Sequence, residues 1–238
     1  MKKIIIAVFS ILLLSILTLF VNYIVVEQRS SEISEGTPIA QKEQKREALL
    51  VIDIQEGITG TSSSTDVFVR SSDELISVVN RIIDSSARHN VPVIYVKNEI
   101  SNPLINLLNN SMAAGSAGAE LDSRLTIVSN YIINKDKSDA FSNHLLDSIL
   151  IGNEINKLVF TGLDLAWCVK STMLAAENRN YDICLISDGL NSEYPDSLKQ
   201  DMLNEFNQRG HEVMSSTEYL RDRYQRGSGA RSLPATVP

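Results

Sequence analysis

The stretch from Leu158 to Asp188 constrains the fold of this chain more than any other. A continuous apolar run begins at Leu158 and ends at Gly162, and an irregular piece then leads to Cys168. A helix-like segment follows, and a second apolar run covers Ile183–Ile186. The order strand, turn, helix, strand is that of a βαβ unit, which requires a parallel sheet.

Cys168 falls at the start of the helix in this unit. The first turn of a helix carries free backbone N–H groups and the positive end of the helix dipole, both of which favour negative charge. A cysteine in such a place is biased toward the thiolate, the form that attacks carbonyl carbons. With Lys135 nearby, we therefore expect the pKa of Cys168 to lie below the ~8.5 of a free thiol. The negative charge of Asp53 acts in the opposite direction, and the alternative is that Asp53 holds the shared proton.

Strand-like and helix-like segments also alternate through the rest of the chain, which predicts a three-layer α/β/α Rossmann-like fold with a mainly parallel six-stranded sheet. A capping box of Ser71 and Glu74 marks the start of the first helix of the globular part. An order of 3-2-1-4-5-6 would place the first strand beside the strand that precedes Cys168. The predicted strands are 48–54, 91–96, 126–133, 158–161, 183–186 and 211–214, and the clearest helices are 71–87, 141–150 and 197–209.

The N-terminal segment is long and apolar enough to cross a bilayer. Lys2 and Lys3 precede a nearly unbroken apolar run from Ile4 to Val26, and ~20 such residues span the hydrocarbon core. The large residues at Val21–Val26 argue against signal-peptide cleavage, and apolarity on every face argues against a core helix. We expect residues 1–26 to be an uncleaved single-pass anchor, with the two lysines cytoplasmic and the domain on the extracytoplasmic side. A cleaved signal peptide is the alternative.

Composition divides the remainder of the chain. Residues 27–47 are polar and charged, which predicts a flexible linker, and 224–238 predict a disordered tail. The globular domain is expected at 48–223. The net charge of −7, with no basic stripe, argues against a nucleic-acid partner. The two cysteines, Cys168 and Cys184, make neither a disulfide framework nor a four-ligand zinc site.

Asp53 and Lys135 are two further candidates for chemistry. Asp53 ends the first strand, so the switch point of the sheet would bring it near Cys168. A helix cap is the alternative role for Asp53, and a solvated loop residue is the alternative for Lys135. A thiol nucleophile needs a proton acceptor and a cation, and these two residues meet that need.

Three motifs together resemble the isochorismatase-like cysteine hydrolase superfamily, which includes nicotinamidases and N-carbamoyl-amide hydrolases. The resemblance spans roughly residues 48–220. The motifs are Asp53-Ile54-Gln55, then Lys135 through Ala140-Phe141, then Gly162 followed by Cys168-Val169.

The resemblance implies a catalytic triad of Asp53, Lys135 and Cys168, without a cofactor. It also implies a cis peptide bond at Leu163–Asp164 and an oxyanion hole formed by the N–H groups of Asp164 and Cys168. Nicotinamidases carry an Asp-x-His metal motif after the second strand, whereas this chain has no histidine at 97–101. No metal site is therefore expected.

Several residues around the site keep two interpretations. Gln55 and Trp167 are candidate substrate contacts, although Trp167 also suits core packing beneath the helix. Cys184 is expected to be a buried small hydrophobe, and a disulfide with Cys168 is the alternative. His89, His144 and His211 are expected to be surface residues rather than ligands.

The sequence thus predicts a membrane-anchored hydrolase that cleaves a C–N bond, an amide or carbamoyl group, of a small molecule through an acyl-enzyme. The alternative is a non-hydrolytic thiol redox or ligand-binding protein on the same scaffold. The resemblance also suggests a homo-oligomer.

Overall fold

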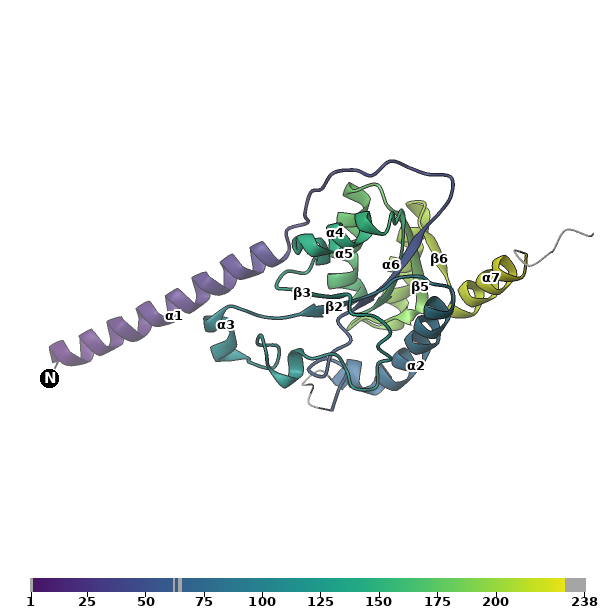
Figure 1. Ribbon diagram of the computed structural model, residues 1–238. Helices are drawn as coiled ribbons and strands as arrows, with labels where there is room; N and C mark the ends of the chain where they lie inside the picture. Colours follow the sequence, from purple (N-terminus) through teal and green to yellow (C-terminus); the bar gives the residue numbers. More distant parts are fainter. Residues whose placement is uncertain (1, 62, 64–65, 230–238) are drawn as a thin grey trace, which may run out of the picture.

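The computed structural model describes residues 2–61, 63 and 66–229, and Figure 1 shows an α/β domain with a long helix extending from it. The strands are β1 (Glu47–Ile52), β2 (Val93–Asn98), β3 (Ile132–Lys135), β4 (Lys157–Gly162), β5 (Asp182–Leu190) and β6 (Glu212–Met214). The α-helices are α1 (Lys2–Ser30), α2 (Asp66–Arg88), α3 (Pro103–Leu108), α4 (His144–Gly152), α5 (Lys170–Asn178), α6 (Asp196–Gln208) and α7 (Ser216–Gly229). Short helices are η1 (Ala117–Ala119), η2 (Ala140–Ser142) and the π-helix η3 (Leu165–Val169).

The six strands form one parallel sheet in the order β3-β2-β1-β4-β5-β6, which confirms the predicted fold class and strand order. Two apolar clusters cover its faces. One cluster joins the sheet to α4, α5 and α6, and the other joins it to α2 and α7. The sheet is therefore the middle of three layers, and its carboxyl-end switch point lies between β1 and β4.

Strand β1 is the centre of the domain. Residues Ala48–Ile52 are all fully buried, as expected for a parallel strand covered on both faces. Strand β4 approaches it closely at Gly162, which has a φ of 110°. A Cβ there would lie 2.0 Å from the Ile52 carbonyl oxygen, so only glycine fits.

Two predicted boundaries were wrong. Helix α2 already begins at Asp66, so Ser71 lies inside it and its hydroxyl donates to the Val67 carbonyl rather than capping the helix. Strand β3 is Ile132–Lys135 instead of 126–133. The Tyr95 hydroxyl donates to the Thr126 carbonyl and accepts from the Val128 N–H, so side-chain bonds replace the ladder there.

Helix α1 is a single 29-residue helix with an apolar window long enough to cross a membrane, a property that a signal sequence near the N-terminus shares. It continues to Ser30, past the predicted end of the anchor at residue 26. At the other end of the chain, α7 extends the domain to Gly229, so 224–229 are helical where a disordered tail was predicted. The remainder of that tail, 230–238, lies outside the described residues.

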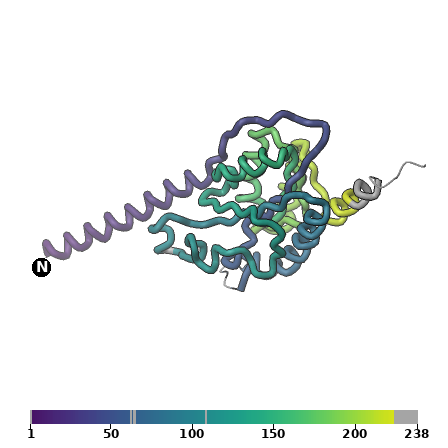
Figure 2. Tube along the Cα trace, viewed as in Figure 1, coloured from purple at the N-terminus to yellow at the C-terminus, as the bar shows by residue number. Residues whose placement is uncertain are grey.

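Residues 31–46, which we call the strap, run from α1 over the side of the domain formed by α4 and α5 and then enter β1 (Figure 2). The strap is mostly without helix or strand, but it is bonded to the domain along its length. The Ile39 N–H donates to the Arg179 carbonyl, and the Arg46 N–H donates to the Asn156 side chain. Ile33 and Ile39 pack on the apolar core. A flexible linker was expected at 27–47, because a polar sequence of this kind cannot fold alone. The strap differs from that expectation, since partners in the domain satisfy its backbone hydrogen-bonding groups.

Candidate active site

Asp53, Lys135 and Cys168 meet at the carboxyl edge of the sheet, although they are far apart in the sequence. Asp53 follows β1, Lys135 ends β3, and Cys168 lies in η3 after β4. The Lys135 ammonium donates to Asp53 Oδ2 at 2.9 Å and to Cys168 Sγ at 3.2 Å. The side chain of Lys135 is fully buried, so its ammonium is shielded from solvent beside the Asp53 carboxylate and the Cys168 sulfur.

Asp53 has two features of a functional carboxylate rather than of a helix cap. Its φ of 54° is in the left-handed region, which costs energy for a residue other than glycine. Its second oxygen, Oδ1, is buried and accepts no hydrogen bond from any described residue. A buried carboxylate oxygen without a donor is poised to take a proton.

The electrostatics of the cluster differ from the sequence-based expectation for the thiol. Burial would lower the pKa of Lys135, but the negative charges of Asp53 and Cys168 outweigh it and raise this pKa overall. Burial and the Asp53 charge raise the pKa of Cys168 to about 12, although Lys135 opposes them. Of the two predicted outcomes, the lowering of the Cys168 pKa is therefore wrong, because desolvation of the thiolate and the charge of Asp53 outweigh the charge of Lys135.

The loop that carries Cys168 is held by Asp164. One Asp164 carboxylate oxygen accepts from the Ala166 N–H at 2.8 Å and the other from the Glu193 N–H at 3.0 Å. The Leu163–Asp164 bond is trans, so the predicted cis geometry was wrong. The trans form is favoured by ~3 kcal/mol for residues other than proline, and these side-chain bonds fix the turn without a cis bond.

Thr172 links the cysteine helix to the loop after Lys135. Its buried hydroxyl donates to the Cys168 carbonyl at 2.8 Å and accepts from the Ala140 N–H at 3.1 Å. This connection joins two of the three loops that form the cluster. The sequence analysis missed Thr172, because its position one turn after the cysteine becomes meaningful only once the two loops are known to touch.

Gln55 is not placed to meet a substrate. The side chain is fully buried, and its amide donates to the Asn98 and Ala119 carbonyls while accepting from the Asn98 N–H. Both amide donors are thus used within the protein. Gln55 therefore positions the loops beside Asp53, in contrast to the expected substrate contact.

Trp167 and Cys184 lie in contrasting environments. Trp167 is 49% exposed and its indole N–H donates to Glu193, so core packing, one of its two predicted roles, is wrong. Cys184 is fully buried in β5, as predicted. Both cysteines of the chain are free, so the alternative of a disulfide between them was wrong.

Lys97 occupies the stretch where nicotinamidases carry their metal motif. It is nearly buried, and its ammonium lies 3.2 Å from Glu99 and 3.1 Å from Glu120. Among the described residues, no three His, Cys, Asp or Glu side chains are grouped so that they could hold a metal ion. Glu99 is instead paired with the ammonium of Lys97.

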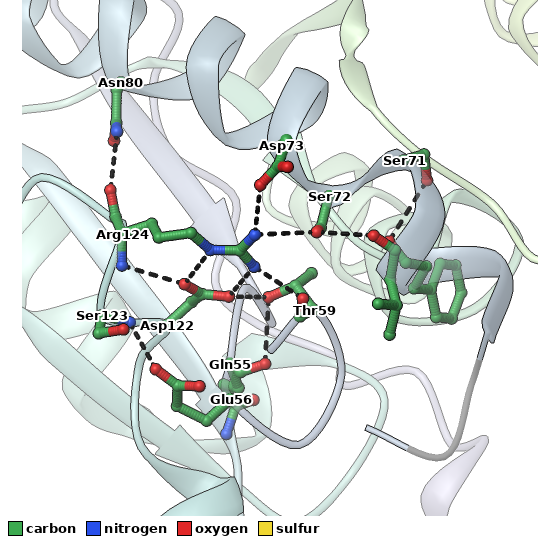
Figure 3. Close-up of polar contacts among 12 residues, drawn as sticks. Gln55, Glu56, Thr59, Ser71, Ser72, Asp73, Asn80, Asp122, Ser123 and Arg124 are labelled. Carbon is green, nitrogen blue, oxygen red and sulfur yellow. Dashed lines mark hydrogen bonds and ion pairs between the residues drawn. The ribbon is translucent and has the colours of Figure 1, made fainter. Parts of the chain in front are cut away.

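A second polar network joins helix α2 to the segments around Thr59 and Asp122 (Figure 3). The Asp122 carboxylate accepts from the Arg124 guanidinium and from the Thr59 hydroxyl, and Arg124 also reaches Asp73 on α2. Burial alone would raise the pKa of Asp122, but these bonds outweigh it and lower the pKa. Sequence reasoning missed this network, whose members come from three separate segments.

A cleft of about 360 Å³ lies beside the carboxyl end of β3, and its lining includes Glu99, Ser101, Ala114, Lys135, Asn143 and His144. The side chain of Lys135 is fully buried, so the cleft meets this residue at its backbone. Cys168 itself is partly accessible.

The sheet and its covering helices define a doubly wound α/β protein. At the switch point of the sheet, a buried lysine lies between a carboxylate and a cysteine that can act as a nucleophile. Residues 47–218 match the isochorismatase domain, and the chain belongs to the isochorismatase family. This match confirms the resemblance found in the sequence. A search of curated proteins gave no significant match.

Solved structures share the fold. A cysteine hydrolase from Pseudomonas syringae is 19% identical, with a TM-score of 0.68, covering 80% of this chain and 99% of that one. N-carbamoylsarcosine amidase from Thermoplasma acidophilum is 27% identical, with a TM-score of 0.61 and coverage of 73% and 97%. A pyrazinamidase from Pyrococcus horikoshii, solved with zinc, is 21% identical, with a TM-score of 0.62 and coverage of 71% and 99%.

Proposed function

We propose that this protein is a cysteine hydrolase that cleaves the C–N bond of an amide or carbamoyl group in a small molecule. The observation that carries the proposal is the Lys135 ammonium, which bridges Asp53 and Cys168 within a fully buried position. The similarity to an N-carbamoylsarcosine amidase supports this choice of bond.

The mechanism follows from where the protons can go. Because the pKa of Cys168 is raised to about 12, the resting thiol is protonated. Asp53 takes this proton as sulfur attacks the carbonyl carbon, and Lys135 stabilises the negative charge that moves between them. Asp53 then gives the proton to the departing nitrogen, which leaves a thioester on Cys168.

Hydrolysis of the thioester returns the site to its starting state. Asp53 accepts a proton from a water molecule, whose oxygen attacks the thioester carbon and releases the acid, and the proton returns to sulfur. The backbone N–H of Cys168 is our candidate donor to the developing oxyanion. Asp164 acts as a positioning residue, since its carboxylate holds the turn that presents this N–H.

Ammonia release from a panel of primary amides, ureas and carbamoyl amines tests the proposal on the full-length chain in detergent. We expect Cys168→Ser to reduce turnover to background. Cys184→Ala is the matched control and should keep turnover, because Cys184 is buried in β5 away from the cluster. Undiminished turnover by Cys168→Ser would overturn the nucleophile assignment and favour a thiol redox or ligand-binding role.

We further propose that α1 anchors the domain to a membrane as a single span, with the domain on the extracytoplasmic side. Lys2 and Lys3 precede the apolar run, and positive residues remain in the cytoplasm. A reporter fused after Pro238 tests the orientation. Activity of an export-dependent reporter is expected, whereas activity of a cytoplasm-dependent one contradicts this orientation.

A further inference from the structure

Ser34 of the strap joins the two segments that carry Lys135 and Cys168. Its N–H donates to Asp139 Oδ2 at 2.9 Å, and its hydroxyl donates to the same oxygen. Its carbonyl accepts from the Arg179 guanidinium at 3.1 Å. Asp139 lies in the loop that follows Lys135, whereas Arg179 directly follows α5, the helix that begins after Cys168. One strap residue is therefore bonded to both segments.

Asp139 takes two of its hydrogen bonds from the strap. The residue is fully buried, and its Oδ1 accepts from the Phe141 N–H at 2.8 Å at the start of η2. Burial raises the pKa of Asp139 overall, while the bonds from Ser34 act in the opposite direction. Loss of these bonds removes two donors from a buried carboxylate oxygen, which is costly away from water. The conformation of this loop is therefore coupled to the position of the strap.

The short helix η2 connects Asp139 to the cysteine. The Ala140 N–H donates to the Thr172 hydroxyl, which donates in turn to the Cys168 carbonyl. Asp139, Ala140 and Thr172 are all fully buried, so bulk solvent does not replace these bonds. A continuous series of contacts thus runs from Ser34 to the backbone of Cys168, whose sulfur lies 3.2 Å from the buried ammonium of the cluster.

The strap lies outside the part of the chain that matches the isochorismatase domain, which begins at residue 47. It is nevertheless seated closely on that domain. A Cβ at Gly36 would collide with the Arg179 guanidinium, so glycine is required for this approach. The bonds of Ser34 to the active-site loops therefore come from a segment that the family domain does not include.

We propose that Ser34 and Asp139 are positioning residues of the hydrolase, and that the active site is complete only when the strap is seated. Ser34 holds the loop after β3 against the end of α5, and this arrangement keeps Cys168 beside Lys135. When the strap leaves, the loop loses its donors and the cysteine is no longer held against the lysine. The inference rests on the proposed hydrolase function.

Ser34→Asp tests the proposal in the full-length chain in detergent at pH 8, because it places a second negative charge against the Asp139 carboxylate. Ser31→Asp is the matched control. It adds the same charge to the strap, but the exposed Ser31 hydroxyl donates to the Gln28 carbonyl rather than to Asp139. We expect kcat for amide turnover to fall about tenfold or more in Ser34→Asp with little change in KM, since displacement of reacting groups slows the chemical step. Ser31→Asp should keep the parental kcat, and so should Ser34→Thr, which retains the hydroxyl.

Hydrogen exchange read by peptide mass provides a measurement that does not depend on turnover. The Ala140 N–H is bonded to Thr172, so peptides covering 136–143 should exchange faster in Ser34→Asp than in the parent or in Ser31→Asp. Exchange in β1 should stay at the parental rate.

Unchanged exchange at 136–143 in Ser34→Asp overturns the positioning role, and so does faster exchange with a parental kcat. Faster exchange in β1 as well would show general destabilisation and overturn it too. If the parent chain hydrolyses no amide in the panel, the hydrolase function fails, and the exchange rates alone decide whether Ser34 holds this loop.

Discussion

Lys135 governs the site at the scale of single residues, because its buried ammonium lies between two groups that compete for one proton. A thiolate and a carboxylate that contact the same ammonium repel each other, and the positive charge of that ammonium offsets the repulsion. The cluster therefore holds one mobile proton. Any change to one of the three residues alters the proton affinity of the others.

Replacing Asp53 by Asn separates reactivity toward alkylation from turnover. Asp53 raises the pKa of Cys168, so Asp53→Asn should lower that pKa and speed iodoacetamide labelling of Cys168 at pH 8. Turnover should fall by roughly 10²–10⁴-fold because the general base is lost. The measurements are peptide mass after timed labelling and ammonia release. Parallel losses of both rates would contradict the role of Asp53 as base.

Metal removal should leave activity unchanged, since Lys97 supplies the positive charge between Glu99 and Glu120. The test is ammonia release before and after dialysis against EDTA. Loss of activity that zinc restores would show that the site holds a metal. Lys97→Met is the companion variant, and it should destabilise the fold by about 1–3 kcal/mol, since the largely buried Glu99 and the exposed Glu120 lose their cation.

The three cluster residues could be predicted from the sequence, because each belongs to a motif and each lies at the end of a predicted strand or the start of a helix. Their proton affinities could not. The direction of the Cys168 pKa depends on how completely the thiol is desolvated, and no local pattern reports burial produced by loops distant in sequence. The structural role of Gln55 was hidden for the same reason, since its partners lie at Asn98 and Ala119.

At the scale of elements, Thr172 couples α5 to the loop after β3. Thr172→Val keeps the shape but leaves the buried Ala140 N–H without a partner, at a cost of about 1–3 kcal/mol. We expect kcat to fall about tenfold, equivalent to ~1.4 kcal/mol of transition-state stabilisation, with little change in KM. Thr172→Ser should restore kcat, because the hydroxyl returns. A fall in thermal stability without a change in kcat would make Thr172 merely structural.

The Asp122 network predicts sensitivity to acid. The folded-state pKa of Asp122 is lowered, so the unfolded chain takes up the proton first as pH falls. Its stabilisation is complete above the unfolded pKa of ~3.9 and is lost as pH falls through the folded value. Urea unfolding at pH 7 and pH 3 should show a smaller loss of free energy in Asp122→Asn than in the parent chain. An equal loss in both would contradict this assignment.

Apolar runs and helical periodicity predicted most of the strands and helices, with two exceptions. Strand β3 was placed too early because Thr126 and Val128 resemble a strand but are bonded to the Tyr95 side chain. Helix α2 was started too late because Ser71 and Glu74 resemble a capping box, whereas Ser71 lies inside the helix and its hydroxyl donates to the Val67 carbonyl. For β3 the deciding partner lies in another part of the chain.

For the whole molecule, the strap joins the anchor to the domain through Arg179. This side chain is nearly buried, donates to the Ser34 and Glu35 carbonyls, pairs with Asp147 and stacks 4.4 Å from the Phe141 ring centroid. One residue thus ties the strap to α4 and to the loop after Lys135. The sequence predicted a flexible linker here, because the polar composition of the strap does not show that a buried arginine elsewhere in the chain donates hydrogen bonds to it.

Arg179→Ala should lower the free energy of unfolding by about 3 kcal/mol, because it leaves Asp147 and two strap carbonyls without their donor. Arg209→Ala is the control. Its pair with Glu177 is more exposed and should contribute only ~0.2–1 kcal/mol. Chemical unfolding of both variants measures the difference, and equal effects would show that the strap is not held by Arg179.

The strap also determines how the protein responds to tension. It begins at the carboxyl edge of the sheet, beside Asp139, and reaches the amino edge near Asn156 before entering β1. A pull between the membrane and the domain would load its hydrogen bonds one after another, as in peeling, whereas the strands of the sheet would be loaded together in shear. The bonds at Ser138 and Asp139 come first in that sequence. Tension on the anchor would therefore reach the lysine loop of the active site before it reached the core.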